Sequence, residues 1–388
     1  CQVEEVRGLS YLVTGGGGYL GHRLIKTLLA AGASQVRALD LRGPLPEWMD
    51  ALPTTLRKTY EQRVEFMFAD IRDATTVRKA VEGVDVVFHI ASFGMSGREQ
   101  LQREKIMAVN VGGTKNLIDA CIETGVSTIV YTSTTNVVFS GNELPNKDET
   151  QPYIPLDRHV DYYSRTKSIA EQTLLAASGA PLKKKARDGR DKLLTCAIRA
   201  AGIYGEGEER HLPRIVDLIK KGMFCFTVGR ADAKVEFVYV ENLPYFISDW
   251  EPINNFLFFR PLLELYGYSY PTLQLPVALM FYLALCIEFT HRVVARVYNF
   301  QPLLTRAEVF KVGVTHYFVP DKPKKDLGYR PLVTMKEGMG RVLAYYAEKD
   351  IAFIDGSKRK NLLEQIQSLL PVILLVIVAL YVANKFLL

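Results

Sequence analysis

The stretch Tyr11-Leu12-Val13-Thr14-Gly15-Gly16-Gly17-Gly18-Tyr19-Leu20-Gly21 decides the fold of this chain. A short apolar run breaks into glycines, and apolar residues then recur at helical spacing, at Leu24, Ile25, Leu28 and Leu29. The sequence therefore predicts a strand, a tight turn and a helix in direct succession. This context matters because a glycine triplet alone is a weak signal for any function.

Gly15, Gly18 and Gly21 have the Thr-Gly-x-x-Gly-x-x-Gly spacing of a dinucleotide-binding turn. One glycine permits the turn, another lets the backbone approach a pyrophosphate, and the third brings helix and strand together. The helix N-terminus adds N–H donors and a positive dipole for the phosphates. We therefore expect these glycines, with Tyr19 and Leu20 between them, to bind a dinucleotide cofactor.

Asp40 ends the next apolar run, nineteen residues after Gly21. A carboxylate at this place accepts hydrogen bonds from the adenosine ribose hydroxyls and repels a 2′-phosphate, which favours NAD. Arg42 lies two residues further on and could accommodate that phosphate, so NADP stays open. The alternative role for Asp40 is that of a turn residue at a strand end.

Alternating strand and helix patterns continue beyond this turn. Buried runs are expected at residues 36–41, 64–69, 84–91 and 128–132, with a helix at 109–124. This alternation predicts an α/β fold, a doubly wound (Rossmann) parallel sheet, over residues 9–200. From 201 to 355 the elements become shorter and mixed, which predicts a smaller substrate-side portion.

Two apolar stretches suggest contact with a membrane. Residues 275–289 begin with LPVALMFYLALCI, which is short for a span, so a buried helix and a helix lying on a membrane both remain open. Residues 369–383 carry no charge, and the segment 367–388 reaches the ~20 residues that a span requires. We expect a C-terminal transmembrane helix there, and the basic run at 358–360 favours a cytosolic catalytic portion.

The composition narrows the class of protein. The 388 residues are 48% hydrophobic and 23% charged, which is globular rather than disordered. A net charge of +6 is mild for this length and predicts no nucleic-acid partner. The five cysteines form no Cys-x-x-Cys pair, so we expect reduced thiols and no metal site.

Tyr163 and Lys167 lie four residues apart, which places a phenol and an ammonium on one face of a helix. A nearby cation lowers the pKa of a phenol from its usual value of about 10 and makes it a usable acid or base. Tyr345 with Lys349 and Tyr381 with Lys385 share the spacing, so context must select among the pairs. Only Tyr163 follows a strand end rich in hydroxyls, Thr132-Ser133-Thr134-Thr135.

Together these motifs resemble the extended short-chain dehydrogenases/reductases, within them the 3-beta-hydroxysteroid dehydrogenase/isomerase branch, and most closely the family 42E group. Further matching stretches are Asp70-Ile71-Arg72-Asp73, Asn110-Val111-Gly112-Gly113-Thr114, Arg199-Ala200-Ala201-Gly202-Ile203-Tyr204-Gly205, HIASFGMSGREQL, YYSRTKSIAEQ, ERHLPRIV, NNFLFFRPLLE and GVTHYF. The resemblance implies an NAD(P)-dependent dehydrogenase that oxidises a CH–OH group of an apolar 3β-hydroxysteroid or sterol. It also implies anchoring in the endoplasmic reticulum membrane and, by analogy, a homodimer.

The resemblance assigns roles to individual residues. Tyr163 would accept the substrate proton, Lys167 would hold the nicotinamide ribose and lower the pKa of Tyr163, and Thr134 rather than Ser133 would be their hydroxyl partner. Asn110 would have a structural or relay part. The remaining implied cofactor contacts are Asp70 and Ile71 beside the adenine and Ala91 beside the pyrophosphate or ribose.

One departure from the resemblance affects these roles. Relatives continue after Leu243 with a helix and loop, whereas this chain passes directly to Pro244 and lacks about one βα-type unit. A form that binds a dinucleotide without turnover is therefore an alternative. A nucleotide-sugar epimerase or dehydratase is another, since such enzymes share the fold and both motifs, although a polar substrate gives no reason for a membrane anchor.

Overall fold

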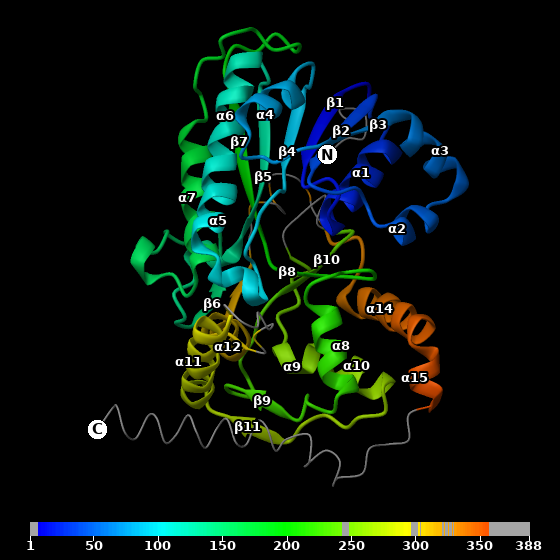
Figure 1. Ribbon diagram of the computed structural model, residues 1–388, viewed down its shortest axis with the longest axis vertical. Coiled ribbons are helices and arrows are strands. Elements are labelled where there is room, and N and C mark those ends of the chain that lie inside the picture. The colour runs from blue at the N-terminus through cyan, green and yellow to red at the C-terminus, as the bar shows by residue number, and fades with distance from the viewer. Residues whose placement is uncertain are drawn as a thin grey trace.

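The computed structural model describes residues 7–242, 248–295, 304–319 and 330–356, with the single residues 302, 322, 325 and 328. Figure 1 shows two portions: a sheet flanked by helices contains the N-terminal half, and a smaller portion of helices and short strands lies below it.

A six-stranded sheet forms the first portion, in the order β3-β2-β1-β4-β5-β7. Every neighbouring pair is parallel, which confirms the predicted doubly wound fold. The strand order reverses between β1 and β4, and ligands of such sheets bind in the crevice at the carboxyl ends of these strands. The strands are Ser10–Thr14 (β1), Gln35–Asp40 (β2), Val64–Phe68 (β3), Val86–His89 (β4), Thr128–Thr134 (β5) and Leu194–Ala200 (β7).

Helices cover both faces of this sheet because its central strands are apolar on both sides (Figure 1). Along β1, Tyr11 and Val13 pack in one core with Ile25 of α1, while Leu12 packs in the opposite core with Leu117 of α6. The helices of this portion are Tyr19–Ala30 (α1), Pro46–Asp50 (α2), Thr54–Arg63 (α3), Ala74–Val81 (α4), Arg103–Met107 (α5), Gly113–Thr124 (α6) and Tyr162–Ala176 (α7).

Two elements differ from what the sequence pattern predicts. The run expected at 84–91 forms a strand only over Val86–His89, because its neighbour β1 ends at Thr14, whose carbonyl accepts from both following amides. The helix expected at 109–124 contains a π-helical turn, Ala108–Gly112, ahead of α6. Such π-turns often occur at functional sites, and this one carries Asn110. The pattern also fails to single out the sixth strand, β7.

The second portion contains three two-stranded parallel ribbons, β8 with β10, β9 with β11 and β6 with β12. Its core is aromatic: the rings of Phe237 and Phe258 stack 3.7 Å apart, and Tyr204 meets Phe258 edge-on. The strands are Leu144–Lys147 (β6), Gly202–Tyr204 (β8), Phe226–Val228 (β9), Phe237–Tyr239 (β10), Leu273–Leu275 (β11) and His316–Phe318 (β12). The helices are Leu212–Lys220 (α8), Asn255–Phe258 (α9), Arg260–Leu265 (α10), Val277–Val294 (α11), Arg306–Gly313 (α12), Met335–Lys349 (α14) and Ile351–Gly356 (α15).

The apolar stretch predicted at 275–289 forms helix α11. One side of α11 packs in a local core through Met280, Leu283 and Ile287, whereas Phe289 is 66% and Val293 61% exposed. In the part of the chain that the structure describes, α11 alone is long and apolar enough to cross a membrane, and 28% of it is buried. The segments 243–247 and 367–388 lie outside the described residues. They contain the position of the predicted missing βα-type unit and the predicted C-terminal anchor.

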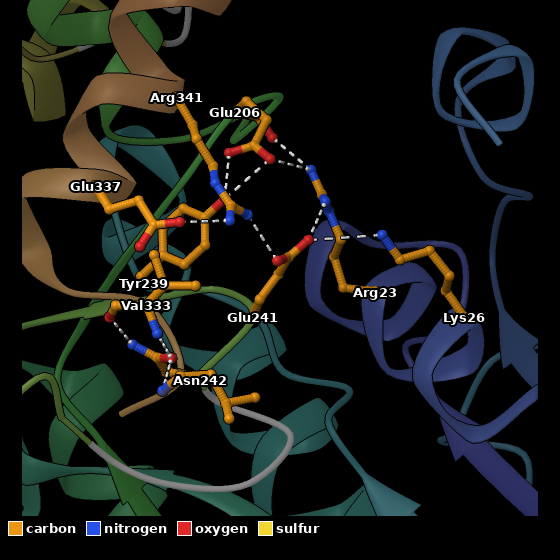
Figure 2. A network of polar contacts seen from close by, with 10 residues as sticks. Arg23, Lys26, Glu206, Tyr239, Glu241, Asn242, Val333, Glu337 and Arg341 are labelled. Carbon is orange, nitrogen blue, oxygen red and sulfur yellow. Dashed lines mark hydrogen bonds and ion pairs between the residues drawn. The ribbon is translucent and has the colours of Figure 1, made fainter. Parts of the chain in front are cut away.

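A polar network joins the two portions beside the glycine turn (Figure 2). Glu241, which follows β10, lies 3.4 Å from Arg23 and 3.6 Å from Lys26, both on α1. The same carboxylate pairs with Arg341 of α14 at 2.9 Å. Arg23 also donates to the carbonyl oxygen of Glu206 at 2.9 Å. The helix that begins at the glycine turn is thereby fixed against the second portion.

Candidate active site

The glycine turn forms a close-packed cradle of backbone. Gly15 has φ +76°, and a Cβ added there would lie 3.0 Å from the amide nitrogen of Ala91. A Cβ at Gly17 would overlap the carbonyl oxygen of Arg42, and one at Gly21 would overlap that of Gly15. Among the residues that the structure describes, no side chain caps the N-terminus of α1, and the first turn of α1 carries no acidic residue. These features fit a pyrophosphate, whose charge the free N–H groups and the helix dipole would balance.

Asp40 connects the glycine turn to the end of β2. Its carboxylate accepts a hydrogen bond from the Gly17 N–H at 3.1 Å and another from the Leu41 N–H at 2.6 Å. Arg42 makes a two-point ion pair with Glu209, at 2.6 and 3.3 Å. The predicted ribose acceptor is thus part of the same rigid turn as the predicted pyrophosphate cradle.

The residues expected near the adenine and ribose lie in the same cavity. Asp70 accepts hydrogen bonds from the Arg72 side chain, and these hold the pKa of the Asp70 carboxyl below its usual value. Ile71 is buried beside Gly113, where a Cβ would overlap its side chain. Asp70 therefore presents a carboxylate already engaged by a cation of its own loop.

A buried histidine fixes the loop that carries Ala91. Thr114 donates its hydroxyl proton to the carbonyl of Asn110 at 2.6 Å, so it accepts from Nε2 of His89 at 2.8 Å. Nδ1 of His89 must then accept from the Thr14 hydroxyl at 2.8 Å. Thr14 in turn accepts from the Ala91 N–H at 3.2 Å. Burial lowers the pKa of His89 to about 3, which keeps the ring neutral and the chain of bonds in one direction.

Tyr163 lies in the first turn of α7. The carboxylate of Asp161 caps this helix by accepting from the Ser164 N–H. The Tyr163 side chain is 5% exposed and lines the cavity. Burial raises the pKa of Tyr163 to about 12, although a hydrogen bond with Ser92 and the charge of Arg210 act to lower it. The lowering of this pKa by Lys167 that the resemblance implies stays a prediction, because Lys167 is not among the groups that shift it here.

Lys167 lies one helical turn after Tyr163 on α7 and is buried. Its Nζ donates a 2.6 Å hydrogen bond to the carbonyl oxygen of Thr132 and sits 4.0 Å over the ring of Tyr131. Burial lowers the pKa of Lys167 to about 7, against an opposing effect of Glu171. Burial thus disfavours the charged form of this side chain.

The hydroxyl groups at the end of β5 are not equivalent. Ser133 donates to the carboxylate of Glu171, so its proton is already committed. The hydroxyl oxygen of Thr134 accepts two hydrogen bonds from Asn136, one from its backbone N–H at 3.3 Å and one from its Nδ2 at 3.0 Å. The Thr134 hydroxyl proton stays available for a ligand oxygen, which favours Thr134 over Ser133 as the partner of Tyr163.

Glu171 is a site residue that the sequence reasoning missed. Its carboxylate is 1% exposed and pairs with Arg199 at 2.8 Å. It also accepts from Tyr153 at 2.6 Å, in addition to Ser133. Glu171 lies eight residues after Tyr163, which places it about two turns along the same helix face. Ser92 was also missed, although it directly follows the predicted contact Ala91 beyond a strand end.

One cavity of about 670 Å³ connects these groups. It brings together all the predicted site residues except Lys167, namely Gly15, Gly18, Tyr19, Leu20, Gly21, Asp40, Asp70, Ile71, Ala91, Thr134 and Tyr163. Part of the cavity lining, from the ribbons, α9 and α11, is apolar. This apolar compartment includes Phe224, Phe226, Phe256, Met280, Leu283 and Ile287, and the charged residues Arg214, Glu308 and Lys311 also line the cavity.

Solved structures share this architecture. An epimerase from Methanothermobacter thermautotrophicus superposes with a TM-score of 0.65 at 19% identity, covering 92% of this chain and 96% of that one. A dTDP-glucose 4,6-dehydratase from Streptomyces venezuelae, solved with NAD bound, gives a TM-score of 0.63 at 20% identity, covering 88% and 98%. At these identities the likeness shows the fold.

Sequence relatives carry the comparison further. Short-chain dehydrogenase/reductase family 42E member 1 of Danio rerio is 49% identical over 344 residues, covering 83% of this chain and 84% of its own length. The Homo sapiens protein of that name is 47% identical over 345 residues, covering 83% and 84%. A 3 beta-hydroxysteroid dehydrogenase/Delta 5-->4-isomerase of Mycobacterium tuberculosis is 34% identical over 362 residues, covering 86% and 90%. Residues 12–244 match the 3-beta hydroxysteroid dehydrogenase/isomerase family, with which NAD(P) dependence is consistent, and the chain belongs to this family.

Proposed function

We propose that this protein is a dehydrogenase that transfers a hydride between a 3β-hydroxysteroid or sterol CH–OH group and NAD(P). One observation supports this above all others. A single cavity joins the glycine cradle, the hydroxyls of Tyr163 and Thr134, and an apolar compartment that includes Phe256 and Met280. A ligand with one reacting hydroxyl on an apolar body fits that sequence of surroundings.

The roles of the polar groups follow from their positions. A nicotinamide dinucleotide, when bound, supplies the hydride acceptor or donor. Thr134 donates its free hydroxyl proton to the substrate oxygen and so fixes the direction of that oxygen. Tyr163 takes the hydroxyl proton when the alcohol is oxidised and returns it when the ketone is reduced. Lys167, whose Nζ is held at the Thr132 carbonyl, does not line the cavity and would influence the protonation of Tyr163 through its charge.

The protonation state of Tyr163 constrains this chemistry. With its pKa raised to about 12, the ligand-free phenol is protonated at neutral pH and ready to donate to a carbonyl oxygen. Alcohol oxidation requires that pKa to fall, which a cation near the phenol would cause. An oxidised nicotinamide ring carries such a charge. The oxidised form, which is required as the hydride acceptor, would then also favour deprotonation of the phenol.

The choice between NAD and NADP rests on the end of β2. The Asp40 carboxylate repels a 2′-phosphate, and the Arg42 guanidinium is already paired with the Glu209 carboxylate. These two acidic groups support NAD as the preferred cofactor.

Membrane attachment is a further part of the proposal. The exposed apolar side of α11, with Phe289 and Val293, lies opposite the side that lines the cavity. A sterol-like substrate could then pass from a bilayer to the site over a short distance. The uncharged run at 369–383 supports a C-terminal anchor, and we propose the endoplasmic reticulum as its membrane. Carbonate extraction of membranes should retain the full chain and release a chain that ends at residue 356.

Turnover tests the proposed function directly. The full-length protein in detergent should reduce NAD when given a 3β-hydroxysteroid, and Tyr163→Phe should abolish the reaction while retaining cofactor binding. A panel of nucleotide sugars tests the epimerase or dehydratase alternative. Binding of a nucleotide sugar without steroid turnover would overturn the steroid assignment. Cofactor binding without turnover on either class would identify an inactive dinucleotide-binding form.

A further inference from the structure

We propose that Glu209 sets the preference of this protein for NAD over NADP by occupying Arg42. The inference rests on the proposed dinucleotide site. It identifies a specificity residue that is far from the glycine turn in sequence and reaches it only through the fold.

The geometry of the pair is that of a fork-to-fork contact. Nη2 of Arg42 lies 2.6 Å from Oε2 of Glu209, and Nη1 lies 3.3 Å from Oε1. Both residues line the same cavity as Asp40. Two parallel N–H···O bonds use the donors with which a guanidinium binds phosphate in the same two-point manner. In this state Arg42 has few donors left for a 2′-phosphate.

Both partners are held in place by their backbones. Gly17 packs so closely on the Arg42 carbonyl that a Cβ would not fit, which fixes the start of the loop after β2. Beside Glu209, the carboxylate of Glu208 accepts from the amides of Arg210, His211 and Leu212 and so orders the loop before α8. The two loops come from different portions of the chain, and the ion pair joins them across the cavity.

The local charge balance explains the expected selectivity. Asp40 and Glu209 contribute two carboxylates beside one guanidinium, so these three groups sum to one negative charge where a phosphate would approach. Without the Glu209 charge, one carboxylate and one guanidinium remain, and Arg42 is free to turn its donors to the ligand. The affinity for NAD should change little, because its ribose hydroxyls are uncharged and would bond to Asp40 rather than to Arg42.

The pair contributes little to folding, which makes the test practicable. The side chains of Arg42 and Glu209 are 49% and 29% exposed, and pairs of this kind contribute about 0–1 kcal/mol. Glu209→Gln should therefore fold. Asp232→Asn is a matched control, because Arg230 and Asp232 form a similar two-point pair outside the cavity-lining residues.

Isothermal titration calorimetry with NAD⁺ and NADP⁺ on the detergent-solubilised full chain tests the inference. Glu209→Gln should bind NADP⁺ about tenfold more tightly than wild type, with NAD⁺ affinity changed less than threefold, since a charge-assisted bond is gained. Asp232→Asn should match wild type. Adding Arg42→Met to Glu209→Gln should remove the gain in NADP⁺ affinity. Arg42→Met as a single substitution should change NADP⁺ affinity little.

Three results would overturn the inference, and they are distinguishable. If wild type binds neither dinucleotide, the proposed function fails and the inference fails with it. If wild type binds NAD⁺ and both Glu209→Gln and Glu209→Ala keep its NADP⁺ to NAD⁺ ratio, only the specificity role is lost. A gain in NADP⁺ affinity that survives Arg42→Met would also overturn it, because mere removal of a negative charge would then suffice.

Discussion

The ammonium of Lys167 donates a 2.6 Å hydrogen bond to the carbonyl oxygen of Thr132 and makes no ion pair within 4 Å among the described residues. A buried cation without a close anion is unfavourable, which is why burial lowers its pKa to about 7. Lys167 therefore lowers the free energy of unfolding, and we expect its role to lie in the candidate active site.

We expect Lys167→Met to separate stability from activity. Turnover of a 3β-hydroxysteroid should fall at least ~10²-fold, the usual range for loss of acid–base support. The melting temperature at pH 7 should stay equal or rise, because the buried ammonium is gone. From pH 7 towards 10 the unfolding free energy of wild type should rise relative to that of the variant, since the wild-type unfolded chain binds an extra proton at residue 167. A parallel fall of melting temperature and turnover would contradict the assignment.

Glu171→Gln should be strongly destabilising. The carboxylate is 1% exposed, and its loss leaves Arg199 without its partner in a half-buried setting. We expect a loss of about 3 kcal/mol in the free energy of unfolding, as for other buried pairs that lose one member. The exposed pair of Arg260 and Glu264 provides the control, because Glu264→Gln should cost under ~1 kcal/mol. Equal costs in urea titrations of the two variants would refute the buried role.

Gly21→Ala should disrupt the glycine cradle. The new Cβ would overlap the carbonyl oxygen of Gly15, so either the turn or helix α1 must move. Calorimetric NAD⁺ binding should be lost. Gly340→Ala is matched, because that exposed glycine lies inside α14 with open space around a Cβ. It should raise the unfolding free energy by ~0.5–1 kcal/mol and leave NAD⁺ binding intact. Retention of full NAD⁺ affinity in Gly21→Ala would remove the turn from the site.

The neutral state of His89 predicts a pH dependence. Burial lowers its pKa to about 3, whereas the unfolded chain has a histidine pKa near 6.5, so the unfolded state binds the extra proton between these values. Stability from this group is full above pH 6.5 and is lost as the pH falls towards 3. Between pH 5.5 and 4, His89→Gln should reduce the slope of unfolding free energy against pH by ~1.4 kcal/mol per unit. An unchanged slope would show that His89 does not titrate on unfolding.

The fold could be predicted because its signals are local. The apolar run of β1, the glycines after it and the helical spacing of Leu24 and Leu28 are all within one short stretch. Strand ends were less predictable: residues 90–91 are apolar enough to continue β4, but their amides bond to Thr14 instead. That bonding depends on a neighbouring strand, which periodicity does not register.

For the site, the sequence determined the residue types and their order along the chain. The spacing of Tyr163 and Lys167 and the strand-end hydroxyls beside them are properties of the primary structure. Only the tertiary structure decided what these groups experience. Burial raises the pKa of Tyr163, an effect that residue spacing does not contain, because desolvation depends on packing from every side. The tertiary structure also brings Glu209 to Arg42, which is 167 residues away in the sequence, and no spacing rule predicts that contact.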